Sequence, residues 1–426
     1  MKKFSSIVLL VVSAARAQTS PLTLEQAIQE ALGRNLDLQA ERLGLSVAEA
    51  RQITAALRPN PVLTFEGQTL NLTGVRFGPD SPLGPNAFNA HADYVIERGN
   101  KRQERMNFAA EDKRLAELQI KELVRRLVLE VQSGFVDVQQ SRAALALAEQ
   151  NLKSLQGIVE VNENRVRTGD LAPVELDRSR VAAIQYETAV EQARLNLDQA
   201  KTRLQRSLGR TAAVPDFDVT GDLRRTGTVG SLEELTQRAI ERRPDLAVTR
   251  QAIARSRSDL KLQIANGKVD YTVGTEYTYQ RAFGIGGSTL GFSFSMPLPV
   301  YNKNQGEIAR AQREGRQYET RTTALEAAIR NETELAWRQY KTAERLLGNI
   351  EANLLDRVRR VREVTEYSYR RGEATLVEFL DAQRAYNDAI QSHTEARASF
   401  ARSLYVIDAV TAADLPANEN NNEKKP

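Results

Sequence analysis

The 426-residue sequence contains no cysteine, only two histidines and three methionines, and few aromatic residues. Without cysteine the chain has no disulfide framework, no thiolate metal site, no cysteine nucleophile and no N-terminal cysteine for lipid attachment. The two histidines, His91 and His393, are far apart and lack the spacing of a metal site. No phosphate-binding glycine motif or catalytic triad pattern stands out. We therefore expect no enzymatic activity, no cofactor and no metal site.

The chain also lacks a strong charge of one sign. Its formal charge is +4, and three of the basic residues (Lys2, Lys3 and Arg16) lie in the leader described next, which lowers the value to +1. A protein that binds nucleic acid through its backbone phosphates normally carries a clear basic excess. Nucleic acid is therefore not an expected partner.

The first seventeen residues have the pattern of an export signal. Lys2 and Lys3 precede an apolar stretch over residues 4–15, and residues 15–17 form an Ala-x-Ala cleavage site. The apolar stretch is shorter than the ~20 residues that a membrane-spanning helix needs. We predict a signal peptide over residues 1–17 and an exported chain without a transmembrane helix. An uncleaved tether is the alternative.

The rest of the sequence, rich in Ala, Arg, Glu, Gln and Leu, is a duplicated unit. Residues 23–38 recur as residues 231–246, and residues 167–175 recur as residues 370–378. A period this long indicates a duplicated half-molecule rather than a solenoid. The predicted boundaries are a first repeat at 18–209, a linker at 210–230, a second repeat at 231–412 and a disordered polar tail at 413–426.

Each repeat is expected to contain a helix, two strands, a very long helix, a turn and a returning helix. Thr23 and Ser231 are predicted N-caps, with Gln26 and Glu234 three residues later as in a capping box. Helix-forming residues without proline run from Gly99 to about Thr168, enough for a rod of roughly 105 Å. Seven-residue seams in the returning helices predict coiled-coil packing. The seams are Leu176, Ala183, Val190, Leu197 and Leu204, then Phe379, Tyr386, His393, Phe400 and Ile407.

Four stretches alternate between apolar and polar residues: 63–68, 88–96, 270–279 and 290–296. Most approach the ~9–11 residues of a tilted transmembrane strand, with one apolar face. Two hairpins of a water-exposed sheet would alternate in the same way. A short external loop is expected at 283–288. If the strands span a membrane, at least two chains must combine, because open strand edges cannot face lipid and single-chain barrels begin at eight strands.

This ordered set of features, present twice, resembles the TolC family of outer-membrane efflux channels from Leu22 to about Ala412. Residues 296–307, at the second strand-to-helix junction, look most like the CzcC/CusC heavy-metal branch, and residues 372–382 follow the family's tip pattern. The resemblance implies an α+β membrane protein. In such a homotrimer, four strands per chain form a twelve-stranded outer-membrane β-barrel, and coiled-coil helices form a periplasmic α-barrel.

The resemblance also implies a function and partners. The chain would be the exit duct of a tripartite efflux system in the outer membrane of a Gram-negative bacterium, passing small solutes or metal cations. Its partners would be a periplasmic adaptor (a membrane fusion protein), an inner-membrane pump of the RND type and outer-membrane lipid. An outlet for type I secretion or drug efflux is the alternative within this class. An exported structural coiled-coil protein is the alternative of another class.

Glu378 and Asp381 are one helical turn apart and share a helix face. In the family, carboxylates at these positions point into a closed tip, where three chains bring six together, and acidic rings favour cations. Glu175 is the counterpart of Glu378, but Arg178 replaces the second acid and argues against a fully two-fold acidic gate. Solvated surface acids are the alternative.

Two further groups of residues have predicted roles. Gly169 and Gly372 are predicted C-caps where the long helices reverse. Pro297 and Pro299 lack N–H donors and should form a hinge from barrel to tunnel. By the resemblance, an adaptor would contact Arg167, Thr168, Gly169, Arg370, Arg371 and Gly372.

Overall fold

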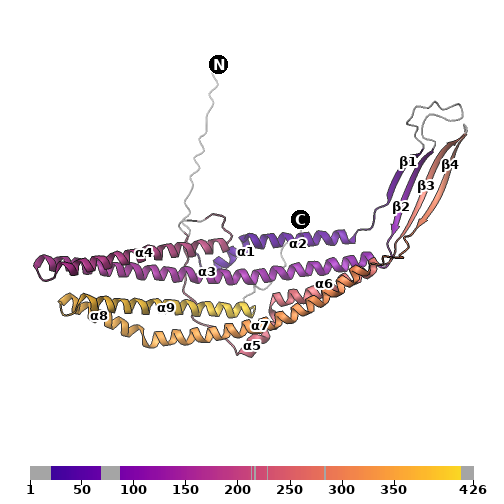
Figure 1. Ribbon diagram of the computed structural model, residues 1–426. Helices are drawn as coiled ribbons and strands as arrows, with labels where there is room; N and C mark the ends of the chain where they lie inside the picture. The colour runs from indigo at the N-terminus through magenta and orange to yellow at the C-terminus, as the bar shows by residue number, and fades with distance from the viewer. Residues whose placement is uncertain are drawn as a thin grey trace, which may run out of the picture. The chain divides into compact units, whose positions relative to one another are not determined.

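The computed structural model describes residues 21–68, 87–212, 214, 217–227, 229–282 and 285–413. The expected signal peptide, residues 414–426 of the expected tail and the loop between the first two strands lie outside these residues. The described chain forms nine helices and four strands (Figure 1). None of these helices combines the length and apolar character needed to cross a bilayer. In order, the elements are α1 (Leu24–Arg34), α2 (Leu36–Ala56), β1 (Val62–Gln68), β2 (Ala87–Ile96), α3 (Lys101–Thr168), α4 (Pro173–Ser207), α5 (Leu232–Arg242), α6 (Pro244–Asn266), β3 (Tyr271–Ala282), β4 (Ile285–Ser295), α7 (Gln305–Asn353), α8 (Leu355–Arg371) and α9 (Leu376–Val410).

The chain divides into two compact units, and neither coincides with one repeat. Because α3 and α7 each run through both units, each unit contains segments of both repeats. Unit 1 consists of the described residues of Met1–Leu38, Val124–Thr236 and Glu332–Pro426. Unit 2 consists of the described residues of Gln39–Leu123 and Gln237–Asn331.

The predicted N-caps are confirmed. The Thr23 hydroxyl accepts from the Gln26 backbone N–H, and the Gln26 side chain accepts from the Thr23 N–H at 3.0 Å. Ser231 and Glu234 make the same reciprocal pair, at 3.3 Å in both directions. Each pair satisfies donors that a helix start leaves without intrahelical partners.

The prediction of a single helix before the strands of each repeat is wrong. The structure has two helices there, α1 and α2 in the first repeat and α5 and α6 in the second. The first break is at Asn35, whose side chain accepts from the Leu38 N–H at 3.0 Å and donates to the Ser207 carbonyl at 3.1 Å. The second is at Arg243, where the following Pro244 disfavours helical backbone in the residue before it.

The second long helix is also interrupted. Whereas α3 continues for 68 residues, its counterpart is divided into α7 and α8 at Leu354, which has φ −101° and ψ −50°. Neither proline nor glycine occurs at Leu354 or its immediate neighbours, so the local sequence carries no signal for this break.

The four strands form one antiparallel sheet in the order β1-β2-β3-β4. The predicted alternation is confirmed, since apolar side chains share one face and polar side chains the other. The expected loop at 283–288 is wrong in part, because β4 begins at Ile285 and Gly286–Ser288 pair with β3. β1 and β4 are the two edges, so a row of backbone groups on each is unpaired within the sheet.

Most residues of the predicted seams are buried inside unit 1, whereas Ala183, Tyr386 and His393 are only partly buried. Leu176, Val190, Leu197 and Leu204 are buried along α4, and Phe379, Phe400 and Ile407 are buried along α9. One apolar cluster near the turns joins helices of both repeats: Leu155, Ile158, Ala182, Tyr369, Leu376 and Phe379. A second cluster contains Val136, Ala398, Ala401 and Tyr405. Each cluster therefore packs helices of both repeats against one another.

Candidate functional site

The two helical turns of unit 1 reverse the chain at glycine residues. Gly169, after α3, has φ +85°, and Gly372, after α8, has φ +80°. At the second turn the Gly372 N–H donates to the Tyr369 carbonyl at 2.9 Å, and the next N–H donates back to α8. Both glycines are therefore C-caps in the left-handed conformation, as predicted.

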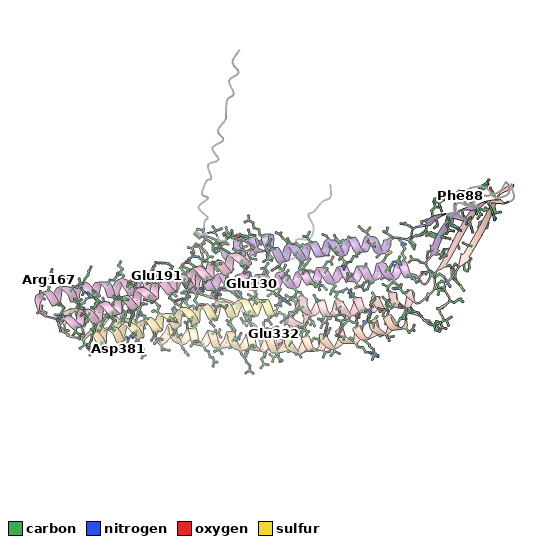
Figure 2. The ribbon with its side chains drawn as sticks, turned by 45° about the horizontal axis from the view of Figure 1, so that its top comes forward. Phe88, Glu130, Arg167, Glu191, Glu332 and Asp381 are labelled. Atoms are coloured by element: carbon green, nitrogen blue, oxygen red, sulfur yellow. The ribbon has the colours of Figure 1, made fainter. Side chains whose placement is uncertain are left out.

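Basic side chains next to these turns are exposed and held by their own helix. Arg167 donates to Asn164 at 2.8 Å, Arg370 to Glu366 at 3.0 Å, and Arg371 to the Tyr367 hydroxyl at 2.6 Å. Figure 2 shows Arg167 and Asp381 at the same end of this unit. The turns thus present basic groups at the surface, beside the acids predicted for the gate.

Glu378 closes a capping box at the start of α9. Its carboxylate accepts from the Thr375 backbone N–H at 2.7 Å and from the Thr375 hydroxyl at 2.9 Å, while the Glu378 N–H donates to that hydroxyl. The backbone hydrogen bond from Thr375, more than the hydroxyl, lowers the pKa of Glu378 below the ordinary glutamate value. The sequence does carry a signal for this capping box, because a threonine is followed three residues later by a glutamate.

The other two predicted gate acids are exposed or paired with arginine. Asp381 lies on the next turn of α9, with its carboxylate 3.6 Å from the Arg384 guanidinium and both side chains mostly exposed. Glu175 lies 2.7 Å from Arg178, the residue that replaces the second acid in the first repeat. The negative charge of Glu175 is therefore largely balanced, and that of Asp381 less so.

Buried amides between the helices near the turns were not predicted. The Tyr369 hydroxyl donates to Asn162 at 2.7 Å, and Gln383 donates to Asn151 at 3.0 Å. Burial is the main cause that raises the pKa of Tyr369, whose ring stacks on Phe379. These bonds join α3 to α8 and α9, and buried polar pairs between helices fix their register.

The apolar face of the sheet in unit 2 is exposed. Its outward side chains include Leu63, Phe65, Phe88, Ile96, Val273, Tyr277, Tyr279, Leu290, Phe292 and Phe294. The register places Ile96 beside Tyr271 and Phe88 beside Tyr279. These two levels are about 26 Å apart along a strand, or about 20 Å vertically at a tilt of ~40°, comparable with the ~25 Å apolar band of outer-membrane barrels.

The opposite face carries acids and His91. The His91 Nε2 atom lies 3.7 Å from carboxylate oxygens of both Glu66 and Glu276. Gly274 leaves space for the side chains of Asp93 and Ser293 on the flanking strands. Among the described residues, no group of three or more potential ligands is placed to hold a metal ion. The face is acidic and polar, and it is well suited to contact with water.

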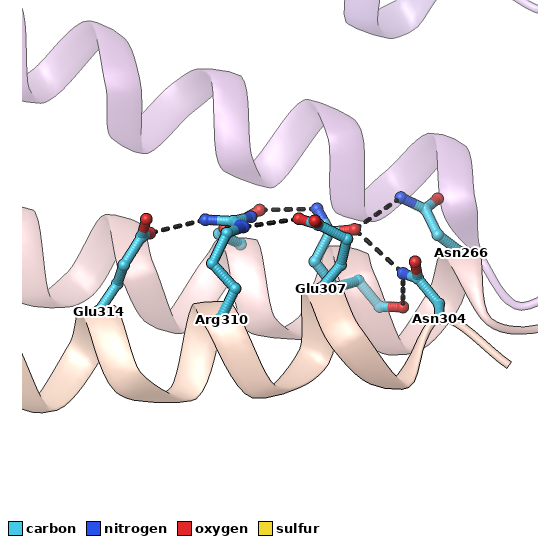
Figure 3. A network of polar contacts seen from close by, with 7 residues as sticks. Asn266, Asn304, Glu307, Arg310 and Glu314 are labelled. Atoms are coloured by element: carbon cyan, nitrogen blue, oxygen red, sulfur yellow. Dashed lines mark hydrogen bonds and ion pairs between the residues drawn. The ribbon is translucent and has the colours of Figure 1, made fainter. Parts of the chain in front are cut away.

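Pro297 and Pro299 lie between β4 and α7, where the strand ladder has ended. The connection ends at Asn304, which has φ +63° and whose amide donates to the Gln263 carbonyl at 2.8 Å. Beyond it, Arg310 contacts Asp259, Glu307 and Glu314 (Figure 3). Hydrogen bonds to Glu307, Asp259 and Glu314 raise the pKa of the Arg310 guanidinium. The ion pair with Asp259, at 2.8 Å, joins the start of α7 to α6.

Comparison with known proteins adds to this geometry. The model of a protein family described as "Outer membrane efflux protein" matches residues 27–210 and 235–412. The chain belongs to the outer membrane efflux protein family. The cobalt-zinc-cadmium resistance protein CzcC of Cupriavidus metallidurans is 23% identical over 370 residues, which cover 87% of this chain and 85% of CzcC.

Two solved structures are similar in fold. The CmeC outer membrane channel of Campylobacter jejuni has a TM-score of 0.75 at 13% identity, covering 92% of this chain and 86% of CmeC. CusC has a TM-score of 0.66 at 17% identity, covering 91% of each chain. The predicted family, fold class and function as an outer-membrane efflux channel are thus confirmed, and the chain is located in the outer membrane with a periplasmic extension.

Proposed function

We propose that three copies of this chain form the exit duct of a tripartite efflux system. The duct passes metal cations or other small solutes from an inner-membrane pump of the RND type, through a periplasmic adaptor, to the exterior. The observation that carries this proposal is the four-stranded sheet, which has one exposed apolar face, one polar face and two open edges. The chain itself carries out no reaction, and energy comes from the pump.

The number three follows from barrel geometry. Lipid provides no hydrogen-bond partners, so the edges of β1 and β4 must pair with other copies. Two copies would close eight strands, whose interior is just wide enough to be filled by side chains. Three copies give twelve strands, the smallest closed set of four-stranded sheets that leaves a lumen, and the face with His91 and Glu276 lines it.

Unpartnered apolar side chains on the helices support the same assembly. Val174, Val181, Ile184 and Leu195 are exposed on α4. Their spacings of seven, three and eleven residues put them on one side of the helix. Exposed apolar side chains on one side of a helix are covered when helices of neighbouring copies pack into a tunnel wall.

Metal cations are the proposed cargo. The support is the similarity to CzcC, whose name states cobalt, zinc and cadmium resistance. Acidic side chains on the polar sheet face and at the turns provide a path that favours cations over anions. A cation in transit is a cargo here, not a resident cofactor.

The tip turns are proposed to close the duct and bind the adaptor. Six carboxylates, from Glu378 and Asp381 of three copies, would form the acidic constriction, with Glu175 contributing less because Arg178 balances it. The proposed adaptor surface consists of Arg167, Thr168, Gly169, Arg370, Arg371 and Gly372. The proposed hinge between barrel and tunnel is Pro297 with Pro299, and the proposed repeats are 18–209 and 231–412, joined by 210–230.

Single-channel recording in planar bilayers tests the gate. The double variant Glu378→Gln with Asp381→Asn removes the charge, while glutamine preserves the capping box. We expect a several-fold larger conductance and a weaker cation preference. Glu191→Gln is the matched control, because Glu191 pairs with Arg194 three residues later, as Asp381 does with Arg384, but lies near the middle of α4 (Figure 2).

The outcomes separate the gate from the channel. If the double variant conducts like the unmodified protein, both acids are ordinary surface residues. The proposed gate is then wrong, although the proposed channel stands. If the unmodified protein forms no pores at all, the proposed duct is wrong.

A further inference from the structure

An exposed apolar tract follows β4. Leu298 is 71% exposed, Val300 65% and Tyr301 91%, and Met296 is also exposed. Apolar residues occupy every second position of the sequence from Leu290 to Val300, past Ser295, where the ladder of β4 ends. Apolar side chains this exposed, and this close together, indicate a contact surface.

Lipid hydrocarbon does not account for this tract. β3 begins at Tyr271, and the residue before it, Asp270, lies 2.7 Å from the Lys101 ammonium and accepts from the Arg98 N–H at 2.9 Å. Charged groups at this level mark the edge of the apolar band, because ions are costly inside a bilayer. If the register of β4 with β3 is continued, Leu298 and the residues after it lie beyond Asp270, on the water side of that edge.

The tract is held in place. The Gln305 amide donates to the Tyr301 carbonyl at 3.0 Å, and the Val300 N–H donates to the Leu298 carbonyl at 2.9 Å. Pro297 and Pro299 fix two of its φ angles. Because the backbone is already ordered, a partner would bind without a large loss of conformational entropy.

A second tract, residues 57–61, precedes β1 at the opposite edge of the sheet. Leu57 is exposed in this tract, and Val62 and Leu63, the first residues of β1, are exposed directly after it. Its backbone is also fixed, since Arg102 donates to the Ala56 carbonyl at 2.6 Å and Arg105 donates to the Leu57 carbonyl at 3.2 Å.

The strand order brings the two tracts together between copies. When β4 of one copy pairs antiparallel with β1 of the next, the residues that follow β4 run beside the residues that precede β1. Four prolines in the two tracts, Pro59, Pro61, Pro297 and Pro299, lack N–H donors, so the ladder is interrupted there. Side chains must then provide the contact.

We infer that Met296–Tyr301 of each subunit packs against Leu57–Pro61 of the neighbouring subunit. This contact covers the apolar tracts on the periplasmic side of the barrel and seals the wall where the strands give way to helices. The inference rests on the proposed trimeric channel, and it assigns the partner surface of that channel at this junction.

Cysteine cross-linking tests the contact cleanly because the chain has no cysteine of its own. Leu57→Cys is combined in turn with Leu298→Cys, Val300→Cys or Tyr301→Cys, since barrel stagger sets which pair is nearest. The full-length protein is oxidised in native membranes with copper phenanthroline and run on non-reducing gels. We expect at least one pair to convert most of the monomer band into covalent trimer, reversibly with reductant.

Four further cysteine pairs decide what a negative result means. Phe65→Cys with Leu290→Cys, Phe292→Cys or Phe294→Cys reports whether the edges of β1 and β4 meet. Leu57→Cys with Leu290→Cys is the matched control, because Leu290 is equally exposed on β4 but lies well inside the apolar band, and this pair should stay monomeric.

If the edges cross-link and no junction pair does, the inferred contact is overturned while the trimeric barrel stands. If neither set cross-links, the trimeric channel fails along with it. A second measurement avoids engineered cysteines: Tyr301→Ser should lower the temperature at which the trimer dissociates on gels by several degrees, and Tyr301→Phe should not. Equal dissociation temperatures for both variants would contradict the contact.

Discussion

Glu378 shows how one side chain combines a local structural role with a proposed function. Its carboxylate caps α9 through Thr375, and the same charge is proposed to narrow the tip. A cap of this kind keeps the carboxylate at a fixed place on the first turn, where a mobile surface acid would spread over many positions. The functional proposal therefore depends on the cap being formed.

We predict that Thr375→Ala loosens the first turn of α9 by about 1 kcal/mol, the usual value of an N-cap, or about fivefold in hydrogen exchange of its amides. Because hydrogen bonding lowers the pKa of Glu378, its contribution is fully present above the ordinary glutamate pKa and is lost as pH falls through the lowered value. Exchange corrected for intrinsic rates should therefore rise in acid. Protection that is the same in Thr375→Ala, or unchanged in acid, would contradict this role.

Buried amides illustrate which site residues the sequence does not disclose. Asn162 and Gln383 read as ordinary polar residues of long helices, and nothing nearby in the sequence indicates Tyr369 or Asn151 as their partners. Their significance comes from the packing of helices more than two hundred residues apart. Glu378 and Asp381, by contrast, are identified by their spacing of one helical turn and by the resemblance to the family.

At the scale of elements, the predictions succeeded where the signal is local. Alternation predicted the four strands, capping boxes predicted the starts of α1 and α5, and glycines predicted the two turns. The break at Asn35 was missed because its amide is held by Ser207, 172 residues away. The break at Leu354 was missed because no proline or glycine occurs at or next to this residue.

The start of α7 depends on Asn304, whose side chain, like that of Asn35, bonds to a residue distant in the sequence. Its φ of +63° is unfavourable for most residues, and its amide bonds to Gln263 offset that cost. Asn304→Ala removes the hydrogen bonds to Gln263 and also places a strained residue at positive φ. Asn304→Gly removes only the hydrogen bonds, because glycine adopts positive φ without strain.

Hydrogen exchange in the first turn of α7 measures the difference. We expect the amides to be best protected in the unmodified protein, less in Asn304→Gly and least in Asn304→Ala. The free energy of opening of this turn should be lower in Asn304→Ala than in the unmodified protein by at least about 1 kcal/mol. Equal protection in the two variants would mean that backbone strain at this position is unimportant.

At the scale of the whole molecule, a single chain leaves surfaces exposed that other copies of the chain would cover. Its sheet has two open edges and an exposed apolar face, and α4 has exposed apolar side chains on one side. The alternation of apolar and polar residues in the strands is compatible with a water-exposed sheet as well as with a membrane barrel. Membership of the outer membrane efflux protein family places the sheet in the outer membrane. The number of copies follows from the argument on barrel closure.

The central claim is therefore tested most directly by the mass of the assembled protein. Native mass spectrometry of the protein, extracted from outer membranes in mild detergent, counts the chains in each particle. We predict a single species of three chains that persists on dilution. A monomer or a dimer as the dominant species would contradict the twelve-stranded channel.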